Sequence, residues 1–278
     1  MYGYCGRILH VDLTHQKFRV EEPGGDFYRK YIGGSCFGVY YALTKMPPRI
    51  DAFDPCNVLV FATSATTGAP ISGASRFNVT AKSPLTGAIG DSQAGGFWGT
   101  ELKYAGFDAV VITGRSPKPT YLWICDGEYE LRDATAIWGR ETGEAQKAIR
   151  EELKDPKVRV ALIGQAGENL VRYACITNEL KHFNGRTGMG AVMGSKNLKA
   201  IAVRGTRPPQ FADKDVILAL ARSGAKRSAT HPVAMSLRDY GTAAVVSGNQ
   251  AESGLPTRNW TSGVFEHADA ISGAAMKN

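Results

Sequence analysis

A glycine-rich run in the second half of the chain combines the residue types of an anion-binding loop. Residues 185–199 contain four glycines and three cations, and they precede the apolar run 200–203. Glycines let the main chain turn tightly and bring its N–H groups close to a ligand, and neighbouring cations favour a negatively charged ligand. The run therefore predicts a site for an anionic group.

The positive charge of the chain is concentrated around this run. Residues 171–206 hold six cations against the single acid Glu179, a local charge of +5 in a chain of net charge +7. Lys196 and Lys199 are three residues apart and share one face if the segment is helical. A solvated cationic face and a ligand contact both remain open for these two lysines, whereas the local excess of charge favours a site.

Two common phosphate loops do not fit the run. A Walker A loop needs four residues between its first glycine and Gly-Lys-Ser/Thr, whereas the order here is Gly194-Ser195-Lys196. A dinucleotide fingerprint needs a glycine three residues after Gly190, where Met193 stands. Nucleotide binding by either loop is therefore not expected.

The composition is ordinary for a soluble globular protein. The 278 residues are 43% hydrophobic and 21% charged, and no apolar stretch reaches 18 residues, so we expect no membrane span. The N-terminus lacks the apolar core of a secretory signal, and we expect a cytoplasmic location. Histidines form no H-x-x-x-H pair, and an all-protein metal cage is not expected. The five cysteines are odd in number and widely spaced, so we expect no disulfide framework or C-x-x-C site, and expect most of them to be small buried apolar residues.

Short alternating and β-branched segments predict a strand-rich first part with few helices. Expected strands are 6–14 and 16–21 (a hairpin), 58–63, 77–81, 109–113, 120–125, 129–132, 158–163, 173–178 and 200–204, with a turn at Asp126-Gly127. Expected helices are 27–45 (interrupted at Gly33-Gly34), 98–104, 144–153, 213–222 and 232–240. A Pro-rich break at 205–209 predicts two domains, 1–207 and 208–278, the second mainly helical. The sequence ends without a helix stop signal, and we expect a longer parent protein or a partner that completes the second domain.

Three glycine-rich points could together form an anion cradle. Gly33-Gly34, Gly95-Gly96 and the run 185–194 each precede a helical or apolar segment, and each alone is explained by a tight turn. Arg76 offers a planar fork of donors, with a solvated surface arginine as the alternative. His182 could contact the same anion, although a lone histidine is commonly structural. No catalytic constellation is visible, so any chemistry must come from a cofactor or another domain.

Five sequence blocks carry a family resemblance. The blocks are 6–14, 81–87, 95–108, 164–171 and 190–200. In this order and spacing they resemble the N-terminal domain of aldehyde:ferredoxin oxidoreductases, which are tungsten or molybdenum bis-pterin enzymes. The resemblance runs from Met1 to about residue 206 and continues more weakly beyond it. Five blocks in register are far more specific than any single glycine motif.

The resemblance implies an α+β fold in which two β-sheets form a base under the metal–pterin cofactor, followed by the beginning of a mainly helical domain. It also implies cofactor-binding residues: Arg76, Gln93, Gly95, His182, Phe183 and Gly185. Main-chain groups of the last five would face the pterin phosphates, and the carbonyls of Gln93 and Phe183 would bind a magnesium ion that bridges these phosphates. Gln93 stands where the family usually has Asn, and His182-Phe183 where it usually has Arg-Ala, so a bulkier loop is expected.

The resemblance further implies oxidation of an aldehyde to a carboxylic acid in the full-length protein. Electrons would pass through a [4Fe–4S] cluster to ferredoxin or another electron-transfer subunit. The cluster cysteines and the acidic pterin motifs of the family lie C-terminal to residue 278, so the chain alone is expected to hold phosphates without completing a redox site. A homo-oligomer remains open.

Two other functions remain as alternatives. The chain could be part of the tungsten subunit of a class II benzoyl-CoA-reductase-type complex, or a stand-alone module that binds an anion or cofactor. Binding of nucleic acid is not expected, because the four tryptophans are not interleaved with the cations.

Overall fold

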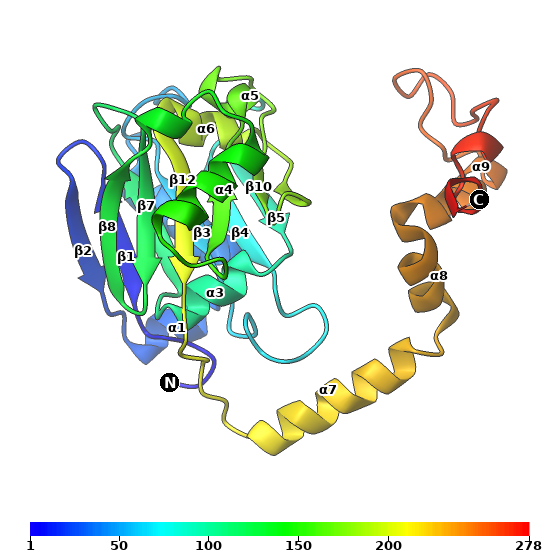
Figure 1. Cartoon of the computed structure of the whole chain (residues 1–278), viewed down its shortest axis with the longest axis horizontal. Coiled ribbons are helices and arrows are strands. Elements are labelled where there is room, and N and C mark those ends of the chain that lie inside the picture. The colour runs from blue at the N-terminus through cyan, green and yellow to red at the C-terminus, as the bar shows by residue number, and fades with distance from the viewer. Residues whose placement is uncertain (278) are drawn as a thin grey trace. The chain divides into compact units, whose positions relative to one another are not determined.

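In the computed structural model of the protein, residues 1–277 are described (Figure 1). Contacts within the chain divide it into two compact units, Met1–Ile217 and a second unit from Leu218 onwards. The predicted domain boundary after residue 207 stays a prediction, and the contacts place their own division after Ile217. Each unit is described by itself.

The first unit contains two six-stranded sheets. The first sheet has the order β2-β1-β6-β3-β4-β5, with β1 and β6 parallel and its other pairs antiparallel. Its strands are β1 (Ile8–Asp12), β2 (Lys17–Glu21), β3 (Leu59–Ala62), β4 (Phe77–Lys82), β5 (Ile89–Ala94) and β6 (Ala109–Thr113).

The second sheet has the order β11-β10-β9-β12-β7-β8, in which β12 and β7 are parallel. Its strands are β7 (Thr120–Cys125), β8 (Glu128–Asp133), β9 (Arg159–Leu162), β10 (Ile176–Asn178), β11 (His182–Asn184) and β12 (Leu198–Arg204). Asp126 and Gly127, both with positive φ, make the two-residue turn between β7 and β8. A turn of this kind matches the twist of the flanking strands.

The two sheets share one apolar core. Successive side chains of a strand point to opposite faces, so each central strand contributes to this shared core on one face and to a separate core on the other. In β12, Leu198, Ile201 and Val203 belong to this shared core, whereas Ala200 and Ala202 belong to a separate core on the other face. In β3, Leu59 and Phe61 likewise belong to the shared core, and their neighbours belong to a third one. Both sheets are therefore buried on both faces, which explains strands such as Leu59–Ala62 without a polar residue.

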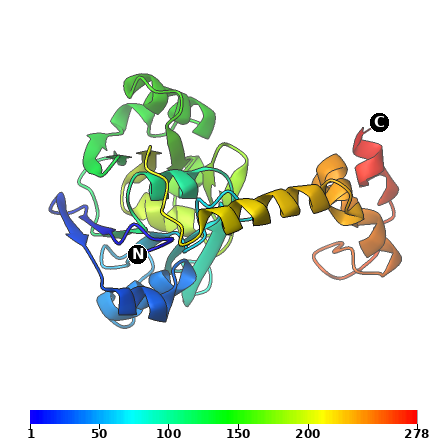
Figure 2. The ribbon, with the colours of Figure 1, turned by 90° about the horizontal axis from the view of Figure 1, so that it is seen from below.

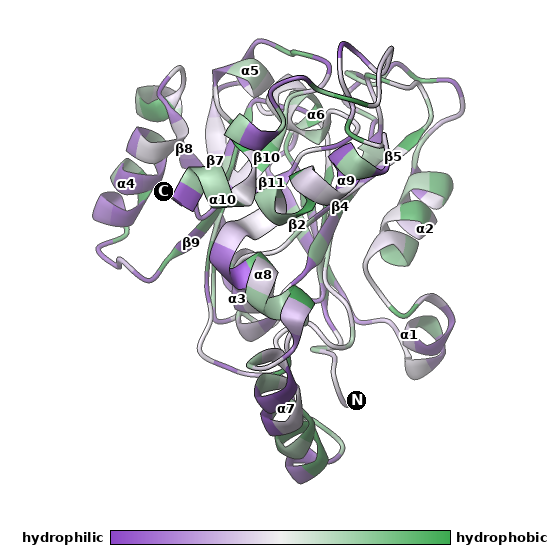
Figure 3. Ribbon diagram, turned by 90° about the vertical axis from the view of Figure 1, so that its right-hand side faces the viewer, coloured by the Kyte–Doolittle hydropathy of each residue, from purple (hydrophilic) through white to green (hydrophobic). Residues whose placement is uncertain are grey.

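Helices cover the outer faces of this pair of sheets. Helices α1 (Gly25–Tyr31) and α2 (Ser35–Lys45) pack on the first sheet, and α4 (Thr142–Glu152), preceded by the short η1 (Thr135–Ile137), packs on the second. Figure 2 shows α1 and α2 (blue) and α4 (green) on opposite sides of the first unit. In Figure 3, α4 shows both purple hydrophilic and green hydrophobic segments, as a helix with one face on a core requires.

Three shorter helices complete the first unit. They are α3 (Trp98–Tyr104), α5 (Gln165–Glu168) and α6 (Met189–Ser195). The Trp98 side chain is fully buried in the shared core, and its indole Nε1 donates to the Ile201 carbonyl of β12 at 2.9 Å. A helix that lies between two strands of the first sheet in the sequence is thus hydrogen-bonded to the second sheet.

The second unit is helical in the part the structure describes. It includes most of α7 (Lys214–Ser228), then α8 (Pro232–Tyr240), η2 (Gly241–Val245), α9 (Val246–Ala251), η3 (Asp269–Ile271) and α10 (Gly273–Lys277). The α+β fold class, with two sheets followed by a mainly helical segment, is confirmed. Among the described residues, no helix is long and apolar enough to cross a membrane.

Most expected elements are confirmed, and the exceptions are informative. The first hairpin, the helix break at Gly33-Gly34, α3 and α8 lie where predicted. β10 begins three residues later than the expected 173–178, and α7 continues six residues past the expected end at residue 222. β5, α5, β11 and α6 were not expected at all.

The expectation that most cysteines are buried is wrong. Cys36 and Cys56 are exposed, and Cys5, Cys125 and Cys175 are half-buried, all five as free thiols. Burial and the nearby Asp108 carboxylate raise the pKa of Cys5 to about 12, so this thiol is unreactive near neutral pH.

Candidate functional site

The edge strands of the two sheets lie next to each other on one side of the first unit. β5 is an edge strand of the first sheet and β11 is an edge strand of the second. The Asn184 side-chain Nδ2 donates to the Ser92 carbonyl at 2.8 Å, and the Arg186 main-chain N–H donates to Ser92 Oγ at 3.1 Å. Two segments far apart in the sequence therefore present their main chains to the same region.

A hollow of about 700 Å³ opens at this junction. Its lining residues are Arg76, Asp91, Ser92, Gln93, Phe183, Gly185 and Arg186. Four of the six predicted cofactor residues, Arg76, Gln93, Phe183 and Gly185, are thus brought together. The other two lie against each other just beside it, because a Cβ placed on Gly95 would be 3.8 Å from His182 Nδ1.

Strand pairing explains how Arg76 reaches the hollow. In the β4–β5 ladder, Phe77 lies opposite Ala94 and Asn78 lies opposite Gln93. Arg76, one residue before β4, is therefore level with the end of β5. Its carbonyl accepts a hydrogen bond from Thr67 Oγ1 at 2.9 Å, which ties the loop before β4 to the strand.

The charges of the hollow favour an anion. Arg76 and Arg186 are exposed and form no ion pair with any residue that the structure describes. The one acid, Asp91, accepts hydrogen bonds from Ser35, Asn78 and Thr80, at 2.8 to 3.1 Å. Because neutral donors already satisfy this carboxylate, the two guanidinium groups are free to attract a phosphate.

The main chain at Gly185 is accessible from the hollow. A Cβ on Gly185 would meet only Phe183 Cβ, at 3.8 Å, so the main chain here is open to a ligand. The Phe183 side chain is 48% exposed and forms part of the wall of the hollow. The lining thus offers main-chain groups and cations, the donor set that phosphate oxygens require.

The rest of the glycine-rich run has a different role from the one expected. A Cβ on Gly190 would lie 2.3 Å from the Cys175 carbonyl oxygen, and one on Gly194 would lie 2.0 Å from that of Gly167. These two glycines let α6 pack against other main-chain segments rather than face a ligand. Only Gly185 and Arg186, at the start of the run, line the hollow.

Both alternatives for the lysine pair are wrong. Lys196 and Lys199 are fully buried, and Lys199 lies in strand β12 rather than on a helical face. Lys196 Nζ donates to the carbonyls of Pro55 and Gly114, both at 3.1 Å. Lys199 Nζ pairs with the Glu168 carboxylate and donates to the Arg140 carbonyl at 3.2 Å. These two positive charges are therefore buried with partners inside the fold and are not available to a ligand at the surface.

Burial gives Lys196 a measurable pH signature. Desolvation lowers its pKa from 10.5 to about 8, so between these values the unfolded chain keeps a proton that the folded chain releases. Raising the pH from 8 to 10 should therefore stabilise the wild type relative to Lys196→Met, by up to about 1.4 kcal/mol per pH unit. Urea unfolding of both proteins at several pH values checks this, and a constant difference across this window would contradict it.

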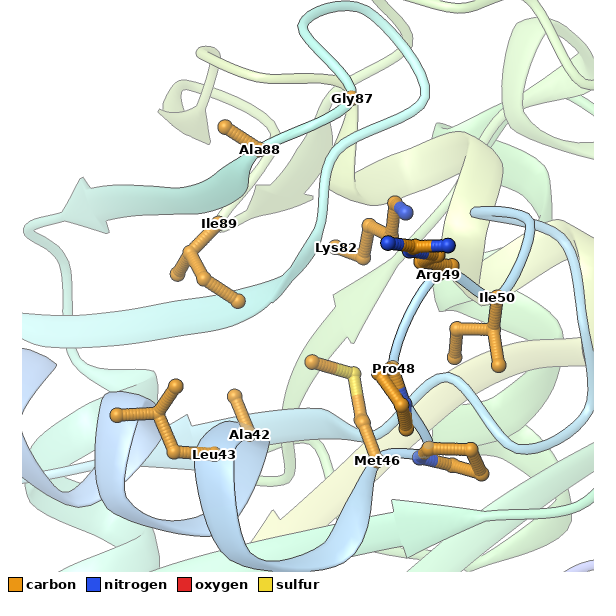
Figure 4. A pocket seen from close by; sticks show the side chains of 11 residues that line it. Ala42, Leu43, Met46, Pro48, Arg49, Ile50, Lys82, Gly87, Ala88 and Ile89 are labelled. Carbon is orange, nitrogen blue, oxygen red and sulfur yellow. The ribbon is translucent and has the colours of Figure 1, made fainter.

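A second pocket, of about 410 Å³, lies between α2 and the β4–β5 hairpin (Figure 4). Leu43, Met46 and Ile89 form apolar walls, and Arg49 and Lys82 lie at one end. None of the six predicted residues lines it. We assign it no role in cofactor binding, and its exposed Arg49 serves below as a control.

Comparison with known proteins identifies the family of this chain. The family model "Aldehyde ferredoxin oxidoreductase, N-terminal domain" matches residues 8–205, and "Aldehyde ferredoxin oxidoreductase, domains 2 & 3" matches residues 219–278. The chain belongs to the aldehyde ferredoxin oxidoreductase family. The resemblance inferred from the sequence blocks is therefore confirmed.

The chain is similar to several named proteins from archaea. The tungsten-containing aldehyde ferredoxin oxidoreductase of Pyrococcus abyssi is 44% identical over 99% of this chain and 46% of its own length. The WOR-like subunit of an aliphatic sulfonate oxidoreductase from Pyrococcus furiosus is 35% identical over 94% of this chain and 44% of its own length. The chain thus spans about half the length of the curated relatives it matches.

A solved structure shares the fold. A chain of the active-site complex BamBC of benzoyl coenzyme A reductase, solved with 1,5-dienoyl-CoA, matches with a TM-score of 0.79 and 36% identity. The match covers 82% of this chain and 35% of that chain. Proteins named for different reactions therefore share this fold, and the fold alone does not identify a substrate.

Sequence reasoning missed three lining residues of the hollow and the strand that carries two of them. Asp91 and Ser92 lie on β5, where the inward positions are the small residues Gly90, Ser92 and Ala94. Such a strand has no apolar alternation to detect. Arg186 was counted in the local charge but not singled out, and its neighbouring glycine was the available signal.

Proposed function

We propose that this chain forms the base of a tungsten or molybdenum bis-pterin site in an aldehyde ferredoxin oxidoreductase. The observation that supports this most strongly is the shared hollow of Arg76, Gln93, Phe183 and Gly185, contributed by two separate sheets. A bis-pterin cofactor carries two phosphates, and a seat built from two segments suits two anionic groups. The tungsten-containing relative at 44% identity supports tungsten as the metal.

In this proposal the main chain of the two segments holds the phosphates. Carbonyl oxygens of Gln93 and Phe183 would hold a bridging magnesium ion, since carbonyl oxygen is a ligand that magnesium accepts. Gly95, His182 and Gly185 would provide main-chain groups beside the phosphates, and Arg76 would place its guanidinium against the cofactor. The bound metal supplies the two-electron redox chemistry of aldehyde oxidation, while these residues fix its position and balance its charge.

The whole protein would pass electrons through a [4Fe–4S] cluster to ferredoxin, with cluster ligands outside the 278 residues. An aldehyde substrate is favoured over the benzoyl-CoA-type alternative by the 44% identical relative named for aldehydes, against 36% identity to the BamBC chain. A stand-alone binding module is disfavoured because residues 219–278 match the following domains of the same family.

Arg76→Ala tests the seat directly. Loss of the guanidinium removes a charge-assisted contact to the anionic cofactor, which we expect to weaken cofactor binding by about 10- to 100-fold. The measurement is tungsten and pterin per chain after anaerobic purification of the whole protein from cells supplied with tungstate. Aldehyde-dependent reduction of ferredoxin should fall with the cofactor content.

Arg49→Ala is the matched control for this experiment. Arg49 is also an exposed arginine that lines a pocket, but it lies in the pocket of Figure 4, between α2 and the β4–β5 hairpin. Its removal should leave tungsten and pterin at wild-type levels. Equal cofactor content in Arg76→Ala and Arg49→Ala would refute the assignment of Arg76.

A further inference from the structure

We propose that the buried side chains of Asn178 and Asn184 are positioning residues that set the distance between the two phosphate-facing segments. The inference rests on the proposed function, because it concerns the same seat. It adds residues that none of the sequence blocks and none of the predicted contacts singled out. Both asparagines are fully buried and lie on the second sheet, in β10 and β11 respectively.

No strand ladder joins the two segments. β5 pairs with β4, and β11 pairs with β10, so the edges of the two sheets meet without main-chain pairing in the described residues. The hydrogen bonds that do cross between residues 92–95 and 178–186 each use a side chain. The relative position of the two segments therefore depends on a few side chains rather than on a repeating backbone pattern.

Asn178 contacts both segments with a single nitrogen. Its Nδ2 donates to the Gly95 carbonyl at 3.2 Å and to the His182 carbonyl at 3.4 Å. A single nitrogen atom therefore links the main chains of the two segments. Asn184, on the neighbouring strand β11, makes a second link, from its Nδ2 to the Ser92 carbonyl at 2.8 Å.

The local geometry is specific for asparagine next to glycine. Gly96 has φ +87, and a Cβ at this position would lie 2.1 Å from Asn178 Oδ1. Asn178 can therefore approach the loop only because residue 96 has no side chain. This requirement gives the second glycine of the Gly95-Gly96 pair a role that the anion cradle alone does not explain.

Burial of both asparagines also costs free energy of folding, because one polar atom of each side chain has no partner in the described part of the chain. Asn178 Oδ1 and Asn184 Oδ1 are buried and have no hydrogen-bond partner among the described residues. An unpaired buried carbonyl lowers the stability of a fold, so packing alone does not explain why these two amides are buried. The two amides act as hydrogen-bond donors, to the Ser92 carbonyl in the lining of the hollow and to the Gly95 and His182 carbonyls beside it.

The experiment measures binding of magnesium pyrophosphate, two linked phosphates with their bridging ion, to the 278-residue chain by titration calorimetry. Asn178→Leu keeps the side-chain size and removes the donor. We expect its dissociation constant to rise about tenfold or more, as for other residues that orient the ligands of a metal. Asn184→Leu should have the same direction of effect.

Asn57→Leu is the matched control. Asn57 is fully buried and its Nδ2 also donates to two carbonyls, those of Ala52 and Lys82, at 2.6 and 3.0 Å. It lies away from the lining of the hollow. Its loss should lower the melting temperature in the same way as Asn178→Leu, while the dissociation constant for magnesium pyrophosphate stays at the wild-type value.

The possible outcomes separate the two proposals. If the wild type binds the probe and Asn178→Leu binds it equally well, the positioning role is wrong and the phosphate seat stands. If Asn57→Leu weakens binding as much as Asn178→Leu, the effect is general destabilisation, and the positioning role is again wrong. If the wild type binds no probe, the phosphate seat itself fails, and the positioning role fails with it. Should Asn178→Leu not melt cooperatively, Asn178→Ser replaces it with the same expected direction.

Discussion

Replacing Asp108 by asparagine is expected to lower the free energy of unfolding by about 3–5 kcal/mol, because it leaves a buried lysine without its counter-charge. The Asp108 carboxylate and the Lys103 ammonium are both fully buried, with Oδ1 and Nζ 2.5 Å apart. The same carboxylate accepts the N–H groups of Cys5 and Gly6, at 3.0 and 2.8 Å, and the Tyr28 hydroxyl at 3.0 Å. The loss should appear as a lower urea midpoint with an unchanged slope.

An exposed ion pair provides the control for this prediction. Lys147 and Glu151 lie one helical turn apart on α4, 3.8 Å from N to O, and both side chains are largely exposed. Glu151→Gln should change stability by about 0.5 kcal/mol or less, since water and ions screen such pairs. If Asp108→Asn proves no more destabilising than Glu151→Gln, the buried pair does not hold the N-terminal segment as the structure indicates.

Trp98→Ala should destabilise the first unit by about 3–5 kcal/mol, the usual cost of removing a large aromatic side chain from a core. Trp98 is fully buried, packs against Phe61 and Phe77 with ring centroids 5.4 and 4.6 Å apart, and donates its indole N–H to β12. The substitution removes contacts with both sheets at once. Thermal or urea unfolding followed by near-ultraviolet circular dichroism measures the loss.

Trp260→Ala is the comparison for this substitution. Trp260 is 78% exposed, so removing its side chain should change the free energy of unfolding by about 0.5 kcal/mol or less. The two variants delete the same atoms from opposite environments. A similar loss of stability in both would mean that Trp98 does not join the sheets.

The sequence predicted the elements of the fold where burial follows a simple period. β3, β6 and β12 are apolar runs, and α4 has apolar residues on one face, so periodicity sufficed for each. β11 has only three residues, and too few positions exist there for any period to appear. α6 consists of small residues whose helical packing depends on main-chain contacts with distant segments. Tertiary structure decides such segments, and local sequence does not.

The candidate site was predictable in part for the same reason. Arg76, Gln93 and Phe183 were expected from the family resemblance, and the structure places all three around one hollow. The lysines Lys196 and Lys199 carried an equally strong local signal of charge, yet they lie inside the fold. The sequence alone does not show whether a charged side chain will be buried against a carbonyl or carboxylate from a distant part of the chain.

The meeting of two sheet edges has a consequence for the order of events during biosynthesis. Ser92 and Asn184, which are hydrogen-bonded across the junction, are 92 residues apart in the sequence. Contacts of such long range form late in folding, because a long loop must close before they are made. If the hollow holds the cofactor as proposed, a chain of which only the first sheet has left the ribosome presents no complete seat, and the cofactor would be inserted after the second sheet has emerged and docked.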